Sequence, residues 1–187
     1  RFWAAVPGAN DDIRVAVIGF GGRGGAHIDA FSNMPGVRLV ALCDCDTKIL
    51  EGMAKRFQDR GKPVETYTDV RKLLENKNID AISTATPNHW HSLITIWGCQ
   101  AGKDVYVEKP VSHNIFEGRK SVEASRKYNR IVQAGTQSRS KPTYPEAWAW
   151  IREGHIGKLK IARGLCYKPR QSIGKVDGEQ PIPSNID

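Results

Sequence analysis

Residues 13–28 of the chain read Ile13-Arg-Val-Ala-Val-Ile-Gly-Phe-Gly-Gly-Arg-Gly-Gly-Ala-His-Ile28. The run Val15–Ile18 is apolar without interruption, which is typical of a strand covered on both faces, as in a parallel sheet flanked by helices. Glycines follow at once with the spacing G-x-G-x-x-G, and apolar residues at helix-compatible spacing come after them. The pattern therefore predicts a strand, a tight turn and a helix in direct succession.

The glycines of this turn have separate physical reasons. Gly19 would make the turn, Gly21 would let a pyrophosphate approach bare backbone, and Gly24 would let the helix pack close to the strand. The free N–H groups and the dipole at the start of the helix would hold the phosphate charge. Because such a glycine pattern is weak evidence when it stands alone, its neighbours decide the interpretation.

An acidic residue in the next strand supports a dinucleotide site. The segment Val37–Cys43 reads as a second strand, and it ends on Asp44. A carboxylate at that strand tip can accept hydrogen bonds from the hydroxyls of an adenosine ribose. The alternative is that Asp44 only caps the following helix, but Asp46 and Thr47 lie closer to the helix start and are better caps. We therefore expect Asp44 to be left free for the ribose.

The composition excludes several classes of protein. With 187 residues, 40% hydrophobic and 26% charged, the chain suits one mid-sized globular domain with some chain left over. No apolar run approaches the ~18 residues of a membrane span. The net charge of +8 comes from scattered basic residues without interleaved aromatic residues, which favours solvated helix faces over nucleic-acid binding. The four cysteines form no C-x-x-C pair, so no metal site is expected.

Strand and helix patterns alternate along the chain, which predicts an α/β fold with a Rossmann-type doubly wound parallel sheet. The expected organisation is a lead-in over residues 1–11, a dinucleotide-binding domain over 12–138, and an incomplete second α/β domain over 139–187. This last part would hold a linker helix and one long strand over residues 158–167. Expected strands lie at 15–18, 37–43, 64–67, 80–85, 104–108 and 131–134.

Polar residues follow several of these strands, at the edge where doubly wound sheets bind ligands. Thr86 and Pro87 mark a helix start, with Thr86 as the N-cap. Asn88 and His91 are three residues apart, so they share one face of that helix. His89 and His91 are two apart and diverge, which argues against a metal. His91 is either a site residue or a surface polar residue.

The two remaining strand ends supply further candidates. Glu108, Lys109 and Pro110 follow the strand at 104–108, and Gln137 follows the strand at 131–134. A buried lysine beside Glu108 could position or move a proton. The alternative for Lys109 is a salt bridge at the end of the loop.

The residues quoted so far resemble those of the glucose–fructose oxidoreductase / inositol dehydrogenase / MocA family. The resemblance rests on the glycine loop, on Asp44, on Thr86-Pro-Asn-His-Trp-His91, on Gly102-Lys-Asp-Val-Tyr-Val-Glu-Lys-Pro110 and on Gly154-His-Ile-Gly157. It implies an NAD(P)-dependent oxidoreductase that acts on a sugar, polyol or related CH–OH substrate. It also implies a homo-oligomer for the full-length protein and a second domain that carries further catalytic residues.

The resemblance implies roles for individual residues. Lys109 and His91 would be catalytic, and NAD would be favoured over NADP because a 2′-phosphate would meet the carboxylate of Asp44. The residues expected to bind the cofactor are Gly19, Gly21, Gly22, Arg23, Gly24, Asp44, Thr86, Pro87, Asn88, His91, Glu108, Lys109, Pro110 and Gln137.

Two alternatives to the oxidoreductase stay open at this point. The family includes a branch of NAD-retaining glycosidases, with which His89-Trp90-His91 is compatible, and a non-catalytic dinucleotide-binding module is also possible. Residues 1–187 alone are expected to show little or no turnover, because half of the cleft would be absent. The expected compartment is the cytoplasm, or the periplasm if a twin-arginine leader precedes Arg1.

Overall fold

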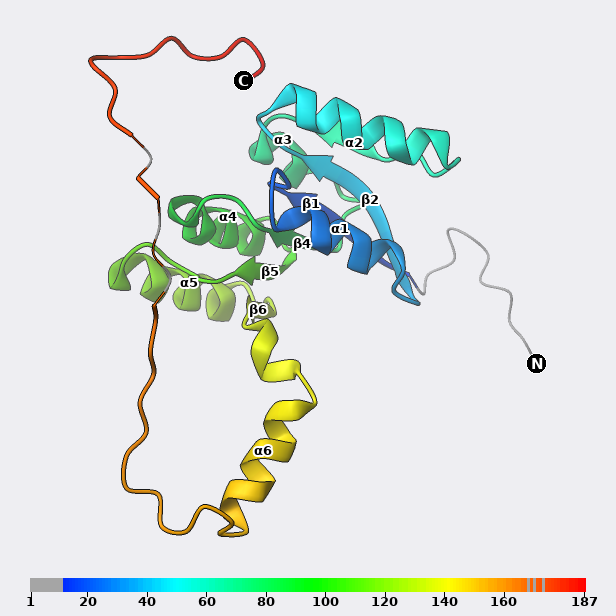
Figure 1. The fold of residues 1–187 in the computed structure, drawn as a ribbon. Helices are drawn as coiled ribbons and strands as arrows, with labels where there is room; N and C mark the ends of the chain where they lie inside the picture. The colour runs from blue at the N-terminus through cyan, green and yellow to red at the C-terminus, as the bar shows by residue number, and fades with distance from the viewer. Residues whose placement is uncertain (1–11, 168, 170, 173) are drawn as a thin grey trace, which may run out of the picture. The chain divides into compact units, whose positions relative to one another are not determined.

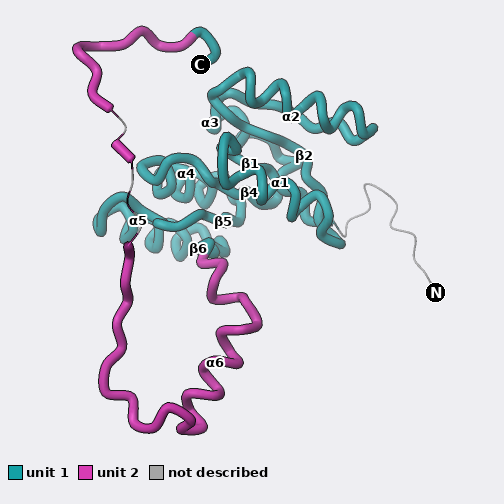
Figure 2. The backbone as a smooth tube through the Cα atoms, viewed as in Figure 1, with its two compact units in different colours: residues 1–135, 184–187 teal, residues 136–183 magenta. Residues whose placement is uncertain are grey.

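The computed structural model describes residues 12–187 except 168, 170 and 173, and the predicted lead-in over residues 1–11 lies outside them. The chain divides into two compact units. The first takes in the described residues up to Gly135 together with Ser184–Asp187, and the second comprises Thr136–Pro183 (Figure 2).

The first unit is built on a parallel sheet of six strands in the described part of the chain (Figure 1). The strand order is β3-β2-β1-β4-β5-β6, and every pair is parallel. This is the doubly wound order of dinucleotide-binding folds, in which the connection reverses direction between β1 and β4. The predicted fold class is therefore confirmed. The strands are β1 (Ile13–Ile18), β2 (Val37–Cys43), β3 (Glu65–Tyr67), β4 (Ala81–Thr84), β5 (Asp104–Glu108) and β6 (Val132–Gly135).

Helices cover both faces of the sheet, and each face has its own apolar core. The helices α1 (Gly24–Ser32) and α2 (Thr47–Asp59) pack on one face, where Val17 and Leu42 meet Phe57. The opposite face, around Ile18 and Val107, is covered by α3 (Val70–Glu75), α4 (Asn88–Gln100) and α5 (Ile115–Lys127). Alternate residues of one strand therefore face different helices.

Three helices of the first unit begin at side-chain caps, and one predicted helix start is displaced. Asp46, Asp69 and Asn114 each accept a backbone N–H of the helix that follows. The predicted start of α4 is wrong by one residue, because Pro87 rather than Thr86 is the N-cap and the helix begins at Asn88. Proline lacks a side-chain acceptor, so this end has no side-chain cap.

The second unit contains the 3-10 helix η1 (Gln137–Ser140) and α6 (Thr143–Arg152). The long strand predicted over residues 158–167 is wrong, since this segment is extended but unpaired and exposed in the structure. An apolar pattern becomes a strand only when a neighbouring strand accepts and donates its hydrogen bonds, and no strand of the described residues does so here. Within the described chain, no helix combines the length and the apolar character that crossing a membrane requires.

Candidate functional site

The turn between β1 and α1 can be built only with glycine at two positions. Gly19 has a φ of +75°, and a Cβ there would lie 2.6 Å from Cγ2 of Thr86. A Cβ on Gly24 would overlap the carbonyl oxygen of Gly19. The turn after β1 and the turn after β4 therefore touch backbone to backbone, at the switch point of the sheet.

The first turn of α1 suits an anion. Its N-cap, Arg23, makes no capping bond with its own side chain. The N–H groups at a helix start carry partial positive charge and donate readily to the oxygens of a phosphate. The bare loop and the uncapped helix start together form a cradle that fits the diphosphate of a dinucleotide.

Asp44 follows β2 and holds two backbone groups at once. Its Oδ2 accepts the N–H of Phe20 at 2.9 Å, and its Oδ1 accepts the N–H of Asp46 at 3.0 Å. The expectation that Asp44 is free of other work is therefore wrong, because it braces the glycine loop against the end of β2. Each carboxylate oxygen keeps a further lone pair, so the ribose hydroxyls can still bind there.

A buried hydrogen-bonded chain joins three elements beneath the glycine loop. The ring of His27 on α1 lies 2.8 Å by Nδ1 from Oγ of Ser83 on β4, and 3.1 Å by Nε2 from Oε1 of Glu108 at the end of β5. A carboxylate only accepts, so Nε2 donates to Glu108. All three residues are buried. Ser83 has no exposed surface, so its hydroxyl cannot reach a substrate. The hydrogen bonds between His27, Ser83 and Glu108 therefore hold three elements together and do not form a nucleophile with its base.

Glu108 collects donors from further sides. Nε of Arg23 lies 3.1 Å from its Oε1, and the N–H of Lys109 lies 3.1 Å from its Oε2. Burial disfavours the charged carboxylate, but the hydrogen bonds from Arg23, His27 and Lys109 outweigh that cost and hold the pKa of Glu108 below its usual value. The start of α1 and the loop after β5 are thus tied to one carboxylate.

His91 lies buried on the first turn of α4, between two loops. Its Nδ1 is 2.6 Å from the carbonyl oxygen of Pro110, and its Nε2 is 2.8 Å from the carbonyl oxygen of Thr86. Both partners are backbone carbonyl oxygens, and they hold the ring from its two nitrogen atoms. His91 therefore links the turn after β4 to the loop after β5. The other histidine of the pair, His89, is exposed, as the spacing predicts.

Three of the remaining predicted residues, Lys109, Pro110 and Asn88, are exposed. Lys109 and Pro110 follow β5 and are exposed, so neither the expected burial of Lys109 nor a salt bridge of its amine occurs among the described residues. Asn88 is exposed at the start of α4. Gln137 begins η1 and belongs to the second unit.

Two residues of the buried chain were missed in the sequence. His27 lies three positions after Gly24 on the helix face that meets the sheet, and Ser83 is a polar residue inside the apolar run of β4. A polar residue on a core-facing position needs a partner. The polar side chain on each core-facing position was therefore the signal in the sequence that could have revealed His27 and Ser83. The ring of Tyr106 also contacts His27, edge-on, with 5.3 Å between the ring centroids.

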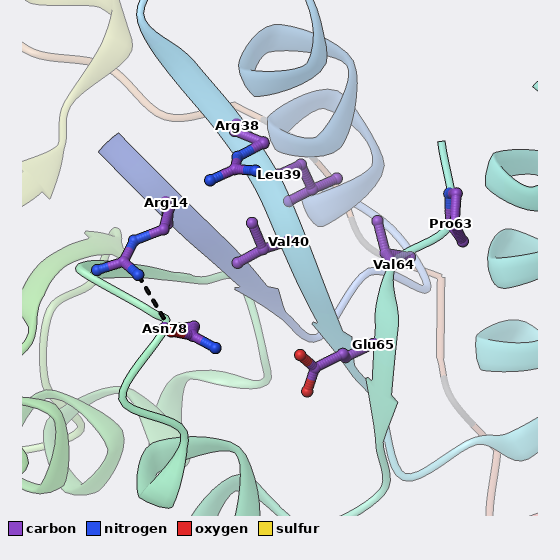
Figure 3. Close-up of a pocket in the computed structure, with 8 residues that line it drawn as sticks. All are labelled: Arg14, Arg38, Leu39, Val40, Pro63, Val64, Glu65 and Asn78. Carbon is purple, nitrogen blue, oxygen red and sulfur yellow. Dashed lines mark hydrogen bonds between the residues drawn. The ribbon is translucent and has the colours of Figure 1, made fainter. Parts of the chain in front are cut away.

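A cavity of about 590 Å³ lies at the opposite end of the strands (Figure 3). Arg14 of β1, Arg38 of β2 and Glu65 of β3 line it, all near the first residues of their strands. Doubly wound sheets bind ligands beyond the carboxyl ends of their strands, so this cavity is not the dinucleotide site. Within the described residues no group of three or more His, Cys, Asp or Glu side chains could hold a metal ion.

A doubly wound sheet with a glycine turn at its switch point, and an acid after β2, defines a dinucleotide-binding domain. The family described as "Oxidoreductase family, NAD-binding Rossmann fold" matches residues 13–136. The chain belongs to the glucose–fructose oxidoreductase / inositol dehydrogenase / MocA family. The predicted family is confirmed, and so is a nicotinamide dinucleotide as the cofactor, without a choice between NAD and NADP.

Individual relatives show what the chain is similar to. An inositol 2-dehydrogenase of Rubrobacter xylanophilus is 31% identical over 84% of this chain and 44% of its own length. A glycosyl hydrolase family 109 protein of a Shewanella species is 34% identical over 57% of this chain and 25% of its own length. The crystal structure of myo-inositol 2-dehydrogenase from Lactobacillus plantarum gives a TM-score of 0.70 at 32% identity, over 79% of this chain and 43% of that one. The chain thus spans less than half the length of these relatives.

Proposed function

We propose that the chain is the cofactor-binding part of an NAD-dependent oxidoreductase that acts on a sugar, a polyol or a related CH–OH substrate. The observation that carries the proposal is the bracing of the glycine loop by Asp44 at the switch point of the sheet. Through this contact the glycine loop, which would hold the diphosphate, lies directly beside Asp44, which would accept the ribose hydroxyls. Similarity to inositol dehydrogenases supports the substrate class.

The cofactor would lie across the carboxyl edge of the strands. Gly21, Gly22, Arg23 and the first N–H groups of α1 would hold its diphosphate, and Asp44 would accept the hydroxyls of its adenosine ribose. The turn after β4, with Thr86, Pro87 and Asn88, would line its nicotinamide side. Bound there, the nicotinamide supplies the acceptor or donor of a hydride.

Lys109 would be the catalytic residue of this chain. It extends from the loop after β5, and its amine would receive or return the proton of the substrate hydroxyl while the hydride moves. Glu108 binds its backbone N–H, and His91 binds the carbonyl oxygen of Pro110, so this loop is fixed on both sides of the lysine. In this proposal His91 acts by positioning the loop, because both of its ring nitrogens are occupied by backbone carbonyls.

The binding part of the proposal is tested by titrating the protein with NADH and NADPH. Wild-type protein should bind NADH more tightly than NADPH, since the 2′-phosphate would meet a carboxylate. Asp44→Ala should weaken NADH binding by about 10- to 100-fold, because it removes hydrogen bonds to a charged acceptor. It should also narrow the preference between the two cofactors.

The matched control is Asp59→Ala, which removes an exposed aspartate at the end of α2 and should leave both affinities unchanged. The ratio of NADH to NADPH affinity separates ribose recognition from simple loosening of the loop, which would weaken both equally. Folded wild-type protein that binds neither cofactor would contradict the proposal.

A second candidate is an NAD-retaining glycosidase, which the similarity to glycosyl hydrolase family 109 proteins favours. The two candidates differ in their products. The complete protein would release the leaving group of an aryl glycoside without net formation of NADH if it were a glycosidase. Net NADH formation from a polyol, with no release from a panel of aryl glycosides, would rule this candidate out.

A further inference from the structure

A short segment far along the chain pairs with the turn that carries Asp44. Ser184–Asp187 returns to the first unit, as its teal colour in Figure 2 indicates. Ile186 forms an antiparallel bridge with Asp46. The N–H of Thr47 donates to the carbonyl oxygen of Asn185 at 2.8 Å, and the N–H of Asp187 donates to the carbonyl oxygen of Cys45 at 3.0 Å.

Side chains add to this pairing. The hydroxyl of Thr47 donates to the same carbonyl oxygen of Asn185 at 3.2 Å. The side chain of Asn185 also lies beside the carboxyl group of Asp46, where it does most to hold the pKa of that group below its usual value. The same carboxylate of Asp46 accepts the N–H groups of Lys48 and Ile49 at the start of α2. The segment therefore holds both the backbone and the side chain of the turn.

The turn leads directly to the ribose acceptor. The N–H of Asp46 donates to Oδ1 of Asp44, whose Oδ2 accepts the N–H of Phe20 in the glycine loop. Hydrogen bonds thus join residues 185–187 to the turn 45–47, and Asp44 joins this turn to the glycine loop. A shift of the turn would move the Asp44 carboxylate relative to the glycine loop.

We propose that Ser184–Asp187 is a positioning strap for the adenosine half of the dinucleotide site. The strap fixes the turn after β2 so that Asp44 presents its free lone pairs to the ribose beside the diphosphate cradle. The inference rests on the proposed function and adds a part of the site that lies outside the βα units. The opposite arrangement, in which the segment occupies the adenosine position and competes with it, is separated by the experiment below.

The test removes one backbone bond of the strap. Asp187→Pro deletes the N–H that donates to Cys45, while Ile186 keeps the extended backbone that a following proline favours. Asp187→Ala is the matched control, because it removes the side chain and keeps the N–H. The ligands are AMP, which carries only the adenosine half, NADH, and reduced nicotinamide mononucleotide, which lacks adenosine.

Asp187→Pro should weaken AMP and NADH binding by the same factor, about three- to ten-fold, as expected for one hydrogen bond. Asp187→Ala should match wild type within about two-fold, and mononucleotide binding should not change in either variant. If Asp187→Pro does not fold, Thr47→Val carries the same comparison, because it removes the hydroxyl that donates to the carbonyl oxygen of Asn185.

Equal AMP affinity in the proline and alanine variants would overturn the inference, and tighter AMP binding by the proline variant would identify a competitor instead of a strap. After either of these two outcomes, the proposed function still stands if wild-type protein binds AMP and NADH. Wild-type protein that binds neither refutes the function and the strap together.

Discussion

Glu108 is the residue whose carboxylate joins the most elements at the edge of the site. Its carboxylate receives Arg23 from the glycine loop, His27 from α1 and the N–H of Lys109 from its own loop. A buried carboxylate is stable only when donors surround it, and removing it would leave His27 and Arg23 facing an uncharged group. We therefore expect Glu108 to contribute to stability and to the position of Lys109 together.

This expectation gives a pH-dependent prediction. Because the pKa of Glu108 in the folded protein lies below its usual value, its contribution to stability is present at neutral pH and is lost as the pH falls through the ordinary glutamate pKa towards the folded value. Glu108→Gln should lower the free energy of unfolding by roughly 3 kcal/mol at pH 7. The difference from wild type should shrink in denaturant titrations performed below about pH 4.

The control is Glu75→Gln, which removes an exposed ion pair with Lys72 and should change stability by no more than about 0.5 kcal/mol. A difference between Glu108→Gln and wild type that stays constant from pH 7 to the acid range would contradict this account of Glu108.

The sequence predicted the types of most site residues but not how they are joined. Asp44 and Glu108 follow strands, so their edge of the sheet follows from topology alone. That Asp44 also braces Phe20 depends on the path of the glycine loop, which no spacing reveals. From α1, the side chain of His27 reaches Ser83 on β4 and Glu108 at the end of β5, so neither His27 nor Ser83 shows a partner in its own segment.

At the scale of elements, the close contact within the glycine turn determines how near α1 lies to β1. Gly24 packs against the carbonyl of Gly19, so α1 can approach β1 only without a side chain there. Gly24→Ala should therefore lower the free energy of unfolding by about 2–3 kcal/mol and weaken NADH binding, as measured by denaturation and titration.

The next residue provides a matched control for this prediction. A Cβ on Gly25 would meet nothing within 4 Å, and alanine favours helix over glycine by about 0.5–1 kcal/mol. Gly25→Ala should leave stability unchanged or raise it. If Gly24→Ala proves as stable as Gly25→Ala, the close packing of this turn does not limit the fold.

The elements that the sequence predicted correctly carry their own signals, in the apolar periodicity of the segment and in the caps at its ends. Each βα unit of the first 135 residues buries its apolar face on its neighbours, so periodicity and caps such as Asp46 and Asn114 suffice. The segment 158–167 has the apolar alternation of a strand, but no strand of the described part of the chain lies beside it. Pairing is a property of two segments, and a single sequence pattern contains only one of them.

For the whole molecule, the chain spans less than half the length of its relatives, and we expect binding and turnover to separate. Residues 1–187 should bind NADH but show no steady-state hydride transfer, since Lys109 is exposed here and the rest of the cleft would come from a second domain. In the complete protein, Lys109→Ala should lower turnover by about 10²- to 10⁴-fold while NADH affinity stays the same. Turnover by residues 1–187 alone would contradict this division.

The central claim is that the glycine turn and Asp44 together hold a dinucleotide at the switch point of the sheet. A crystal of the protein soaked in NAD tests it most directly. The account predicts that the diphosphate lies on the N–H groups at the start of α1, with the adenosine ribose hydroxyls on the Asp44 carboxylate. A fully soaked crystal with no dinucleotide in this place, or with its adenosine far from the end of β2, would contradict it.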